Sequence, residues 1–265
     1  MARKLHYFDT NGIAESVRYM LHYAKQKFED VRYDSQSWPV EQVKKSLPFG
    51  QLPLYEEGNK SLYQSVAIAR YIGAVHNLIP ADIWEQAQLD AIVLSVYDFW
   101  SKVIAYVKEQ DIVKKQELKK EILGEWIDFY FARFENQLKN NKGFFGGKLS
   151  WADFVFVGIV EAINLRLGEQ IERKYPHVAA LVDKIRNLPG VKEYIVSRKP
   201  YLTWADFVFV GIVEAINLRL GEQIERKYPH VAALVDKIRN LHGVKEYIVS
   251  RKPYVLLIIH SVKLL

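Results

Sequence analysis

The C-terminal part of the chain repeats itself. Residues 149–201 recur as residues 202–254, and the two 53-residue copies differ only at Ser150/Thr203 and Pro189/His242. Solenoid repeats diverge more and need about three copies to bury a shared core. Two near-identical copies at one end indicate a tandem duplication instead, or an error in the assembled gene sequence. The non-redundant chain is therefore about 200 residues long, followed by the duplicate and an apolar tail at 255–265.

Composition narrows the classes of protein to which this 265-residue chain can belong. It is 49% hydrophobic and 26% charged, which excludes wholesale disorder and fibrous repeats. It has no cysteine, which excludes disulfides, thiolate metal sites and a cysteine nucleophile. The net charge of +6 is not gathered into a Lys/Arg run, so it favours a solvated surface over a nucleic-acid-binding face. We expect no metal and no nucleic-acid partner.

Neither end of the chain predicts a membrane or secretory segment. The tail 255–265 is shorter than the roughly 20 apolar residues that span a bilayer. The first residues, MARKLHYFD, lack the apolar core of a signal peptide. We expect a cytoplasmic protein without a membrane partner.

The first 76 residues alternate between strand and helix patterns. Period-two runs predict strands at 4–8 and 28–33, and helical spacing predicts a helix at 15–25. A short helix at 40–46 precedes a hairpin of strands 52–55 and 61–63 with Gly58 at its turn, and a further helix begins at Ser65. The order is β-α-β-α-β-β-α.

Strand patterns end at the linker around Pro80. Residues 83–109 and 113–140 predict two long amphipathic helices, and each copy of the repeat predicts three more. We therefore expect an α/β domain at 1–78, an all-helical domain at 83–201, the duplicate at 202–254 and the tail at 255–265.

Five motifs in this order resemble one protein family. They are Leu5-His6-Tyr7-Phe8, Ser37-Trp38-Pro39, the run LPFGQLP at 47–53, the run YQSVAIARY at 63–71, and Ser150-Trp151-Ala152-Asp153-Phe154. Together they resemble the sigma class of cytosolic glutathione S-transferases, of invertebrate type and related to the haematopoietic prostaglandin D synthases. The resemblance covers residues 3–201. It implies a thioredoxin-like N-terminal domain, an all-α C-terminal domain, a homodimer and a role in detoxification.

The resemblance makes Tyr7 the expected catalytic residue. A free thiol has a pKa of about 8.5, and a hydroxyl that donates to the sulfur lowers that pKa and makes the thiolate of bound glutathione available. The helix beginning near Gly12–Glu15 adds a positive dipole end. From the residues alone, one tyrosine among sixteen is a packing residue.

The resemblance also implies a set of glutathione-binding residues. Gln64 and Ser65, at a helix start, would hold the γ-glutamyl carboxylate, although Ser65 also reads as a plain helix cap. Leu52-Pro53 resembles the cis-proline step of the family, which frees the Leu52 backbone to pair with the cysteinyl part. Trp38, Lys44 or Lys45, and Gln51 would contact the glycyl end of glutathione, and Gly50 lies in the same binding motif. Asp98 would reach across the dimer to the glutathione bound by the partner subunit.

The electrophile pocket is expected at Asn11, Ile13, Trp100 and Ala105, by position only. Relatives often carry arginine where this chain has Ile13, so one electrostatic contribution to the thiolate is absent. The resemblance implies secondary peroxidase or prostaglandin isomerase activity, and Ile13 weighs against the isomerase.

The two copies compete for one position against the long helices. Seating the second copy loops out 53 residues, which costs roughly 3–4 kcal/mol by (3/2)RT ln n. Pro189 also suits the first turn of the last helix in the first copy. We predict that the first copy packs and that the second is an appendage exposing Phe207, Val210, Val213 and Ile216. Ser150 and Asp153 form a capping box with a structural role.

The sequence thus predicts a glutathione S-transferase that conjugates small electrophiles. The alternative from another class is a non-catalytic, crystallin-like or ligand-binding relative, which Ile13 and the extra repeat favour. An interaction module like those of elongation factors is a third reading.

Overall fold

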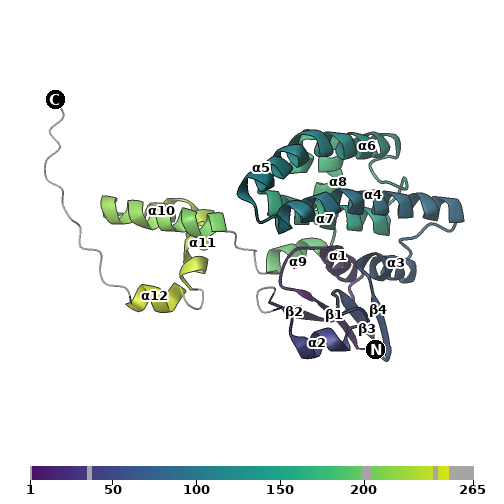
Figure 1. The fold of residues 1–265 in the computed structure, drawn as a ribbon, viewed down its shortest axis with the longest axis horizontal. Helices are drawn as coiled ribbons and strands as arrows, with labels where there is room; N and C mark the ends of the chain where they lie inside the picture. Colours follow the sequence, from purple (N-terminus) through teal and green to yellow (C-terminus); the bar gives the residue numbers. More distant parts are fainter. Residues whose placement is uncertain (1, 35–37, 199–203, 241–243, 251–265) are drawn as a thin grey trace. The chain divides into compact units, whose positions relative to one another are not determined.

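The computed structural model describes residues 2–34, 38–198, 204–240 and 244–250, except for the side chains of residues 204–207, 246 and 250 (Figure 1). The chain forms two compact units, 1–199 and 200–265. Each unit is described by itself. The predicted tail and the Ser37 of the second motif lie outside the described residues.

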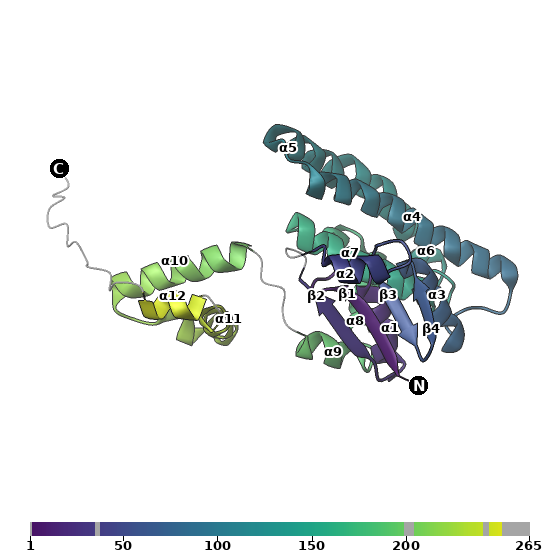
Figure 2. The ribbon, with the colours of Figure 1, turned by 60° about the horizontal axis from the view of Figure 1, so that its bottom comes forward.

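A four-stranded mixed sheet begins the first unit. Its strands β1 (Arg3–Phe8), β2 (Glu29–Tyr33), β3 (Leu54–Glu57) and β4 (Lys60–Tyr63) lie in the order β2-β1-β3-β4, as Figure 2 shows. β1 is parallel to β2 and antiparallel to β3. The helices α1 (Glu15–Tyr23), α2 (Glu41–Ser46) and α3 (Ser65–Val75) complete the predicted thioredoxin-like order.

Six further α-helices follow in the first unit. They are α4 (Ile83–Lys108), α5 (Ile112–Glu121), α6 (Ile127–Asn140), α7 (Trp151–Leu167), α8 (Pro176–Arg186) and α9 (Val191–Ser197). A 3₁₀ turn, η2 (Ile171–Lys174), precedes α8. α1 and α3 lie between the sheet and the layer of α4 and α7 (Figure 1).

The prediction of one continuous helix over 113–140 is wrong. A π-helical segment, η1 (Ile122–Trp126), interrupts it between α5 and α6. Ile122 and Ile127 are both buried although they are five residues apart. An α-helix would turn these two side chains to different faces, whereas the wider π turn brings them to the same face.

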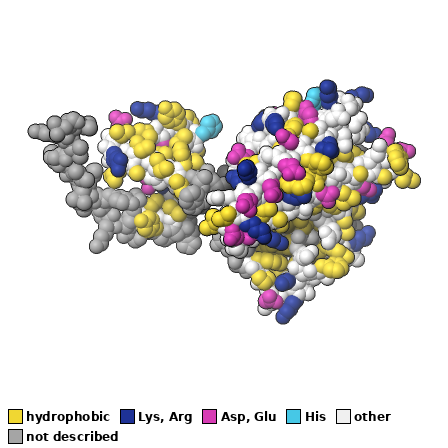
Figure 3. Space-filling model, turned by 45° about the horizontal axis from the view of Figure 1, so that its top comes forward, with side chains coloured by type: hydrophobic (Ala, Val, Ile, Leu, Met, Phe, Trp, Pro, Cys, Tyr) yellow, Lys and Arg dark blue, Asp and Glu magenta, His cyan; other side chains and the backbone are white. Residues whose placement is uncertain are grey.

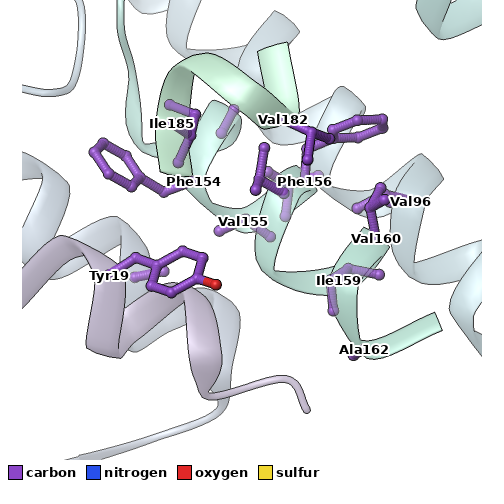
Figure 4. Packing of buried hydrophobic residues seen from close by; sticks show 14 of the residues in the cluster. Tyr19, Val96, Phe154, Val155, Phe156, Ile159, Val160, Ala162, Val182 and Ile185 are labelled. Carbon is purple, nitrogen blue, oxygen red and sulfur yellow. The ribbon is translucent and has the colours of Figure 1, made fainter. Parts of the chain in front are cut away.

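The core of the first unit runs continuously from the sheet to α9. At its centre lies α7, whose Phe154, Phe156 and Ile159 are fully buried, with Tyr19 of α1 pointing toward them (Figure 4). The capping box holds the start of α7, because Asp153 Oδ2 accepts from Ser150 N at 2.7 Å and from Ser150 Oγ at 2.8 Å. The two domains expected at 1–78 and 83–201 therefore lie together in one compact unit.

The second unit repeats the elements of the first copy. It contains α10 (Trp204–Leu220), the 3₁₀ turn η3 (Ile224–Lys227), α11 (Pro229–Arg239) and α12 (Val244–Ser250). Its buried cluster consists of Val210, Val213, Val235 and Ile238. The expectation that Val210 and Val213 are exposed is wrong, because α11 covers them, and Phe207 has no described side chain.

A different face of α10 is exposed. It carries Val208, Phe209, Ile212 and Ile216, and Figure 3 shows apolar side chains gathered on the second unit. The first copy, in contrast, packs against α1, α4 and α6, as the loop-closure argument predicted. Pro189 lies in the turn before α9 and not in its first turn, since α9 begins at Val191. Within the described parts of both units, no helix is long and apolar enough to cross a membrane.

Candidate active site

The Tyr7 hydroxyl lies at the point where β1 ends and α1 begins. Tyr7 is only 6% exposed, and its Oη accepts a hydrogen bond from the backbone N–H of Ile13 at 3.3 Å. Burial raises the pKa of Tyr7, so the hydroxyl keeps its proton at neutral pH. No acceptor for the Tyr7 hydrogen lies within the described residues, so this hydrogen can be donated to a bound anion.

Gly12 makes this position available to the hydroxyl. A Cβ on Gly12 would lie 2.5 Å from Tyr7 Oη and 3.0 Å from its Cε1, far inside contact distance. No side chain fits there while the tyrosine keeps its place. The sequence places Gly12 near the start of a helix, but the requirement for glycine depends on how the end of β1 folds against this turn.

Two guanidinium groups lie near the Tyr7 ring. Arg18 is centred 5.7 Å from the ring, and its charge is balanced by Glu15 at 3.0 Å and Asp30 at 3.1 Å. Arg166, from α7, donates from Nη1 to the carbonyls of Asn11 at 2.9 Å and Ala162 at 2.8 Å. Both charges act to lower the pKa of Tyr7, Arg166 more than Arg18, without cancelling the effect of burial.

Arg166 was missed in the sequence analysis. Its position contains a signal, because Glu161 and Arg166 are the only charged residues between Phe154 and Leu167. From the sequence alone, a charged residue in an apolar helix is assigned to the solvent-exposed side of that helix. Only the fold shows what its side chain contacts. Here its guanidinium is centred 4.7 Å from the Trp100 ring, which joins two of the residues expected in the electrophile pocket, Asn11 and Trp100.

The other two residues expected in that pocket differ from each other. Ile13 is partly buried and adjoins the Tyr7 hydroxyl through its backbone N–H. Ala105 is exposed, and it follows Trp100 by five positions, which correspond to about 1.4 turns of α4. The two side chains therefore face different directions, and Ile104, which packs against the core, lies closer to the Trp100 face.

Gln64 and Ser65 form the start of α3. Gln64 is exposed and has φ of +68°, a conformation that costs a non-glycine residue energy and marks functional sites. Ser65 is buried, and its Oγ hydrogen-bonds the hydroxyl of Tyr97 on α4 at 2.7 Å. The Ser65 side chain is therefore held in place by a residue that the sequence analysis did not identify. The first backbone N–H groups of α3 have no acceptor within the helix, which makes the helix start suitable for an anion.

The loop between α2 and β3 brings the remaining predicted residues together. The Leu52-Pro53 peptide bond is cis, as the resemblance implied, and so is Trp38-Pro39. Gly50, at φ +62°, has the Lys44 side chain beside it: an added Cβ would lie 3.3 Å from Lys44 Cγ. This contact places the side chain of Lys44, one of the two candidate lysines, beside Gly50.

Trp38 and Asp98 are the last two of the residues expected to bind glutathione. The Trp38 ring packs edge-on against Phe8 at 5.4 Å and lies 5.8 Å from Tyr33, so β1 and β2 position it. Asp98 is exposed on α4. No contact in the described chain ties Asp98 to the other predicted residues.

A buried ionic cluster fixes α1 to the end of the first copy. Arg198 pairs with Glu15, donates to Tyr19 Oη at 3.1 Å, and lies 3.3 Å from Glu161 Oε2. Tyr194 also donates to Glu15, at 3.0 Å. These partners are more than 100 residues apart for most pairs, so no local pattern predicts them.

One cavity lies apart from this site. It has a volume of about 520 Å³ and is lined by the linker and by α4 and α6, including Leu78, Gln88 and Gln137. None of the predicted site residues lines it. The residues predicted for the active site therefore lie outside this cavity.

Comparisons with known proteins identify the family of this chain. The family model of the glutathione S-transferase N-terminal domain matches residues 3–74, and that of the C-terminal domain matches residues 97–198 and 200–251. Glutathione S-transferase S1 of Drosophila melanogaster is 34% identical over 197 residues, covering 73% of this chain and 78% of its own. Hematopoietic prostaglandin D synthase of Mus musculus is 32% identical, covering 74% and 96%. The solved structure of prostaglandin synthase D of Nilaparvata lugens has a TM-score of 0.72 and 37% identity, covering 76% of this chain and all of that one. The chain belongs to the glutathione S-transferase family.

Proposed function

We propose that this glutathione S-transferase activates bound glutathione through the hydroxyl of Tyr7 and conjugates it to small electrophiles. The observation that carries the proposal is the Tyr7–Ile13 hydrogen bond. The backbone N–H occupies one lone pair of a buried, protonated phenol, and the phenolic hydrogen is left for the sulfur. Hydrogen bonding to the charged form lowers the pKa of the thiol.

The remaining parts of glutathione match the groups around the Tyr7 hydroxyl. The γ-glutamyl carboxylate is assigned to the start of α3 at Gln64 and Ser65, and the cysteinyl backbone to Leu52 next to the cis Pro53. The glycyl carboxylate is assigned to Trp38, Lys44 and Gln51, beside Gly50. Asp98 would act across a homodimer of sigma-class type, and the second copy would be a tandem duplication outside the catalytic unit.

In the reaction the thiolate attacks an electrophilic carbon. A sulfur–carbon bond forms, and either a leaving group such as chloride departs or, with an enal, the product takes up a proton. Tyr7 holds the sulfur as thiolate before this step, and Trp100 offers an aromatic wall to the electrophile.

The test is conjugation of glutathione to a chloronitroaromatic by the wild type and by Tyr7→Phe. We expect kcat/KM to fall about 100-fold, as when one preorganised donor is removed from a developing anion, with little change in the Kd of glutathione. Tyr228→Phe, an exposed tyrosine of the second unit, is the control and should retain full activity. Equal background rates for wild type and Tyr7→Phe, with glutathione still bound, would favour the ligand-binding or crystallin-like alternative.

A further inference from the structure

Arg166 differs from three other buried or partly buried arginines of the first unit. Arg18 pairs with Glu15 and Asp30, Arg32 with Asp9 and Asp30, and Arg198 with Glu15 and Glu161. Arg166 is partly buried, yet no carboxylate of the described residues lies within ion-pair distance of it. Its Nη1 donates to two carbonyls, and within the same described part Nε and Nη2 have no protein acceptor.

A partly buried guanidinium without a counter-charge is costly to keep in a folded protein. The two carbonyls offset only part of this cost, because they are dipoles and not charges. They also fix where the positive charge lies, since Asn11 and Ala162 belong to the turn before α1 and to α7. The Trp100 ring of α4, whose centroid lies 4.7 Å from the guanidinium carbon, contacts the group in a cation–π arrangement.

The position of this charge points to the anion that it would balance. Asn11 lies two residues before Ile13, whose N–H holds the Tyr7 hydroxyl. Ile13 itself is apolar, and the other cation near Tyr7, Arg18, is already neutralised by two carboxylates. Arg166 is thus the cation next to the Tyr7 site whose charge is left uncompensated by the described protein.

We propose that Arg166 supplies the positive charge that stabilises the thiolate of glutathione in this chain. The inference rests on the proposed function, because the anion is the thiolate that Tyr7 holds. In the free protein, the Asn11 and Ala162 carbonyls hold the guanidinium in place. In the complex, the side of the group that carries Nε and Nη2 would face the thiolate and balance its negative charge. The same charge favours electrophiles that develop negative charge as the sulfur attacks.

The experiment uses the full chain and measures the pKa of enzyme-bound glutathione from the ultraviolet absorbance of the thiolate as a function of pH. In Arg166→Gln we expect this pKa to rise by about one unit, which is an approximately tenfold loss of thiolate below the pKa. kcat should fall by a similar factor at pH values below that pKa, with KM for glutathione little changed. Arg166→Lys, which retains the charge, should restore part of the shift.

The repeat supplies a matched control. Arg219 lies at the same place in the same sequence on α10, is exposed, and has no part in the site. Arg219→Gln should leave the thiol pKa unchanged. An unchanged thiol pKa in both Arg166→Gln and Arg166→Lys would overturn the proposal and leave Arg166 a packing residue, even if the melting temperature fell. A wild type that binds no glutathione, or binds it without a thiolate signal, would instead overturn the proposed function and this inference with it.

Discussion

At the scale of single residues, the site depends on one side chain and on one missing side chain. The Tyr7 hydroxyl occupies the space that a Cβ on Gly12 would take, and the Ile13 N–H holds it there. The motif around Tyr7 could be recognised in the sequence. The need for glycine at position 12 could not, because it arises only when the end of β1 meets the turn before α1.

We predict that Gly12→Ala impairs conjugation as strongly as Tyr7→Phe, about 100-fold in kcat/KM, because the methyl group displaces the hydroxyl from its position. Steady-state kinetics would show it, and the double variant should lose little more than either single variant. Gly124→Ala is the control, since no atom lies within 4 Å of its added Cβ. A fully active Gly12→Ala enzyme would contradict the assigned role of the Tyr7 hydroxyl.

Asp153 predicts a pH dependence of stability. Burial raises its pKa to about 6, although three hydrogen bonds from Phe145 and Ser150 oppose the shift. Between about pH 4 and 6 the folded state therefore binds more protons than the unfolded state, so stability falls as pH rises through this window. The difference in unfolding free energy between wild type and Asp153→Asn should shrink by on the order of 2–3 kcal/mol from pH 4 to pH 6.5. Urea unfolding at several pH values measures it, and a constant difference would argue against the raised pKa.

At the scale of elements, α7 and α10 show one sequence in two environments. Residues 151–167 and 204–220 are identical. In α7, Val155, Phe156 and Ile159 are buried by α1, α4 and neighbouring helices, whereas in α10 the matching Val208, Phe209 and Ile212 are exposed. Hydrophobic periodicity predicts both helices equally well, but burial depends on whether a partner helix is present.

Gly158 and Gly211, which occupy the same place in α7 and α10, should respond differently to substitution by alanine. A Cβ on Gly158 would lie 2.7 Å from the Ser16 backbone nitrogen in α1, whereas nothing lies within 4 Å of one on Gly211. Gly158→Ala should lower stability by about 1–3 kcal/mol through overpacking against backbone. Gly211→Ala should raise the stability of its helix by about 0.5–1 kcal/mol, since alanine is the better helix former. Hydrogen exchange read separately on the two units gives both values, and the same sign for both would contradict the packing of α7 on α1.

At the scale of the whole molecule, every residue assigned to the site lies in the first unit. A chain that stops after Lys199 should therefore conjugate glutathione at the wild-type rate. A chain that stops after Ser197 removes Arg198 and leaves the buried Glu15 without one of its two arginine partners. We expect it to lose about 3–5 kcal/mol of stability, the usual cost of breaking a buried ion pair. Thermal unfolding and conjugation assays on both chains decide the matter, and loss of activity in the longer one would show that the second copy contributes to the site.

The sequence by itself determined the order of strands and helices, the repeat, and the family motifs that contain Tyr7, the Leu52-Pro53 bond and Gln64. These features depend on residue spacing over a few positions, which periodicity and short motifs record. Only the tertiary structure showed what Arg166, Tyr97 and Arg198 contact, because their partners Asn11, Ser65 and Glu15 lie far away in the sequence. It also decided which of the two near-identical copies is buried: the first unit has one set of partner helices, and the first copy occupies it.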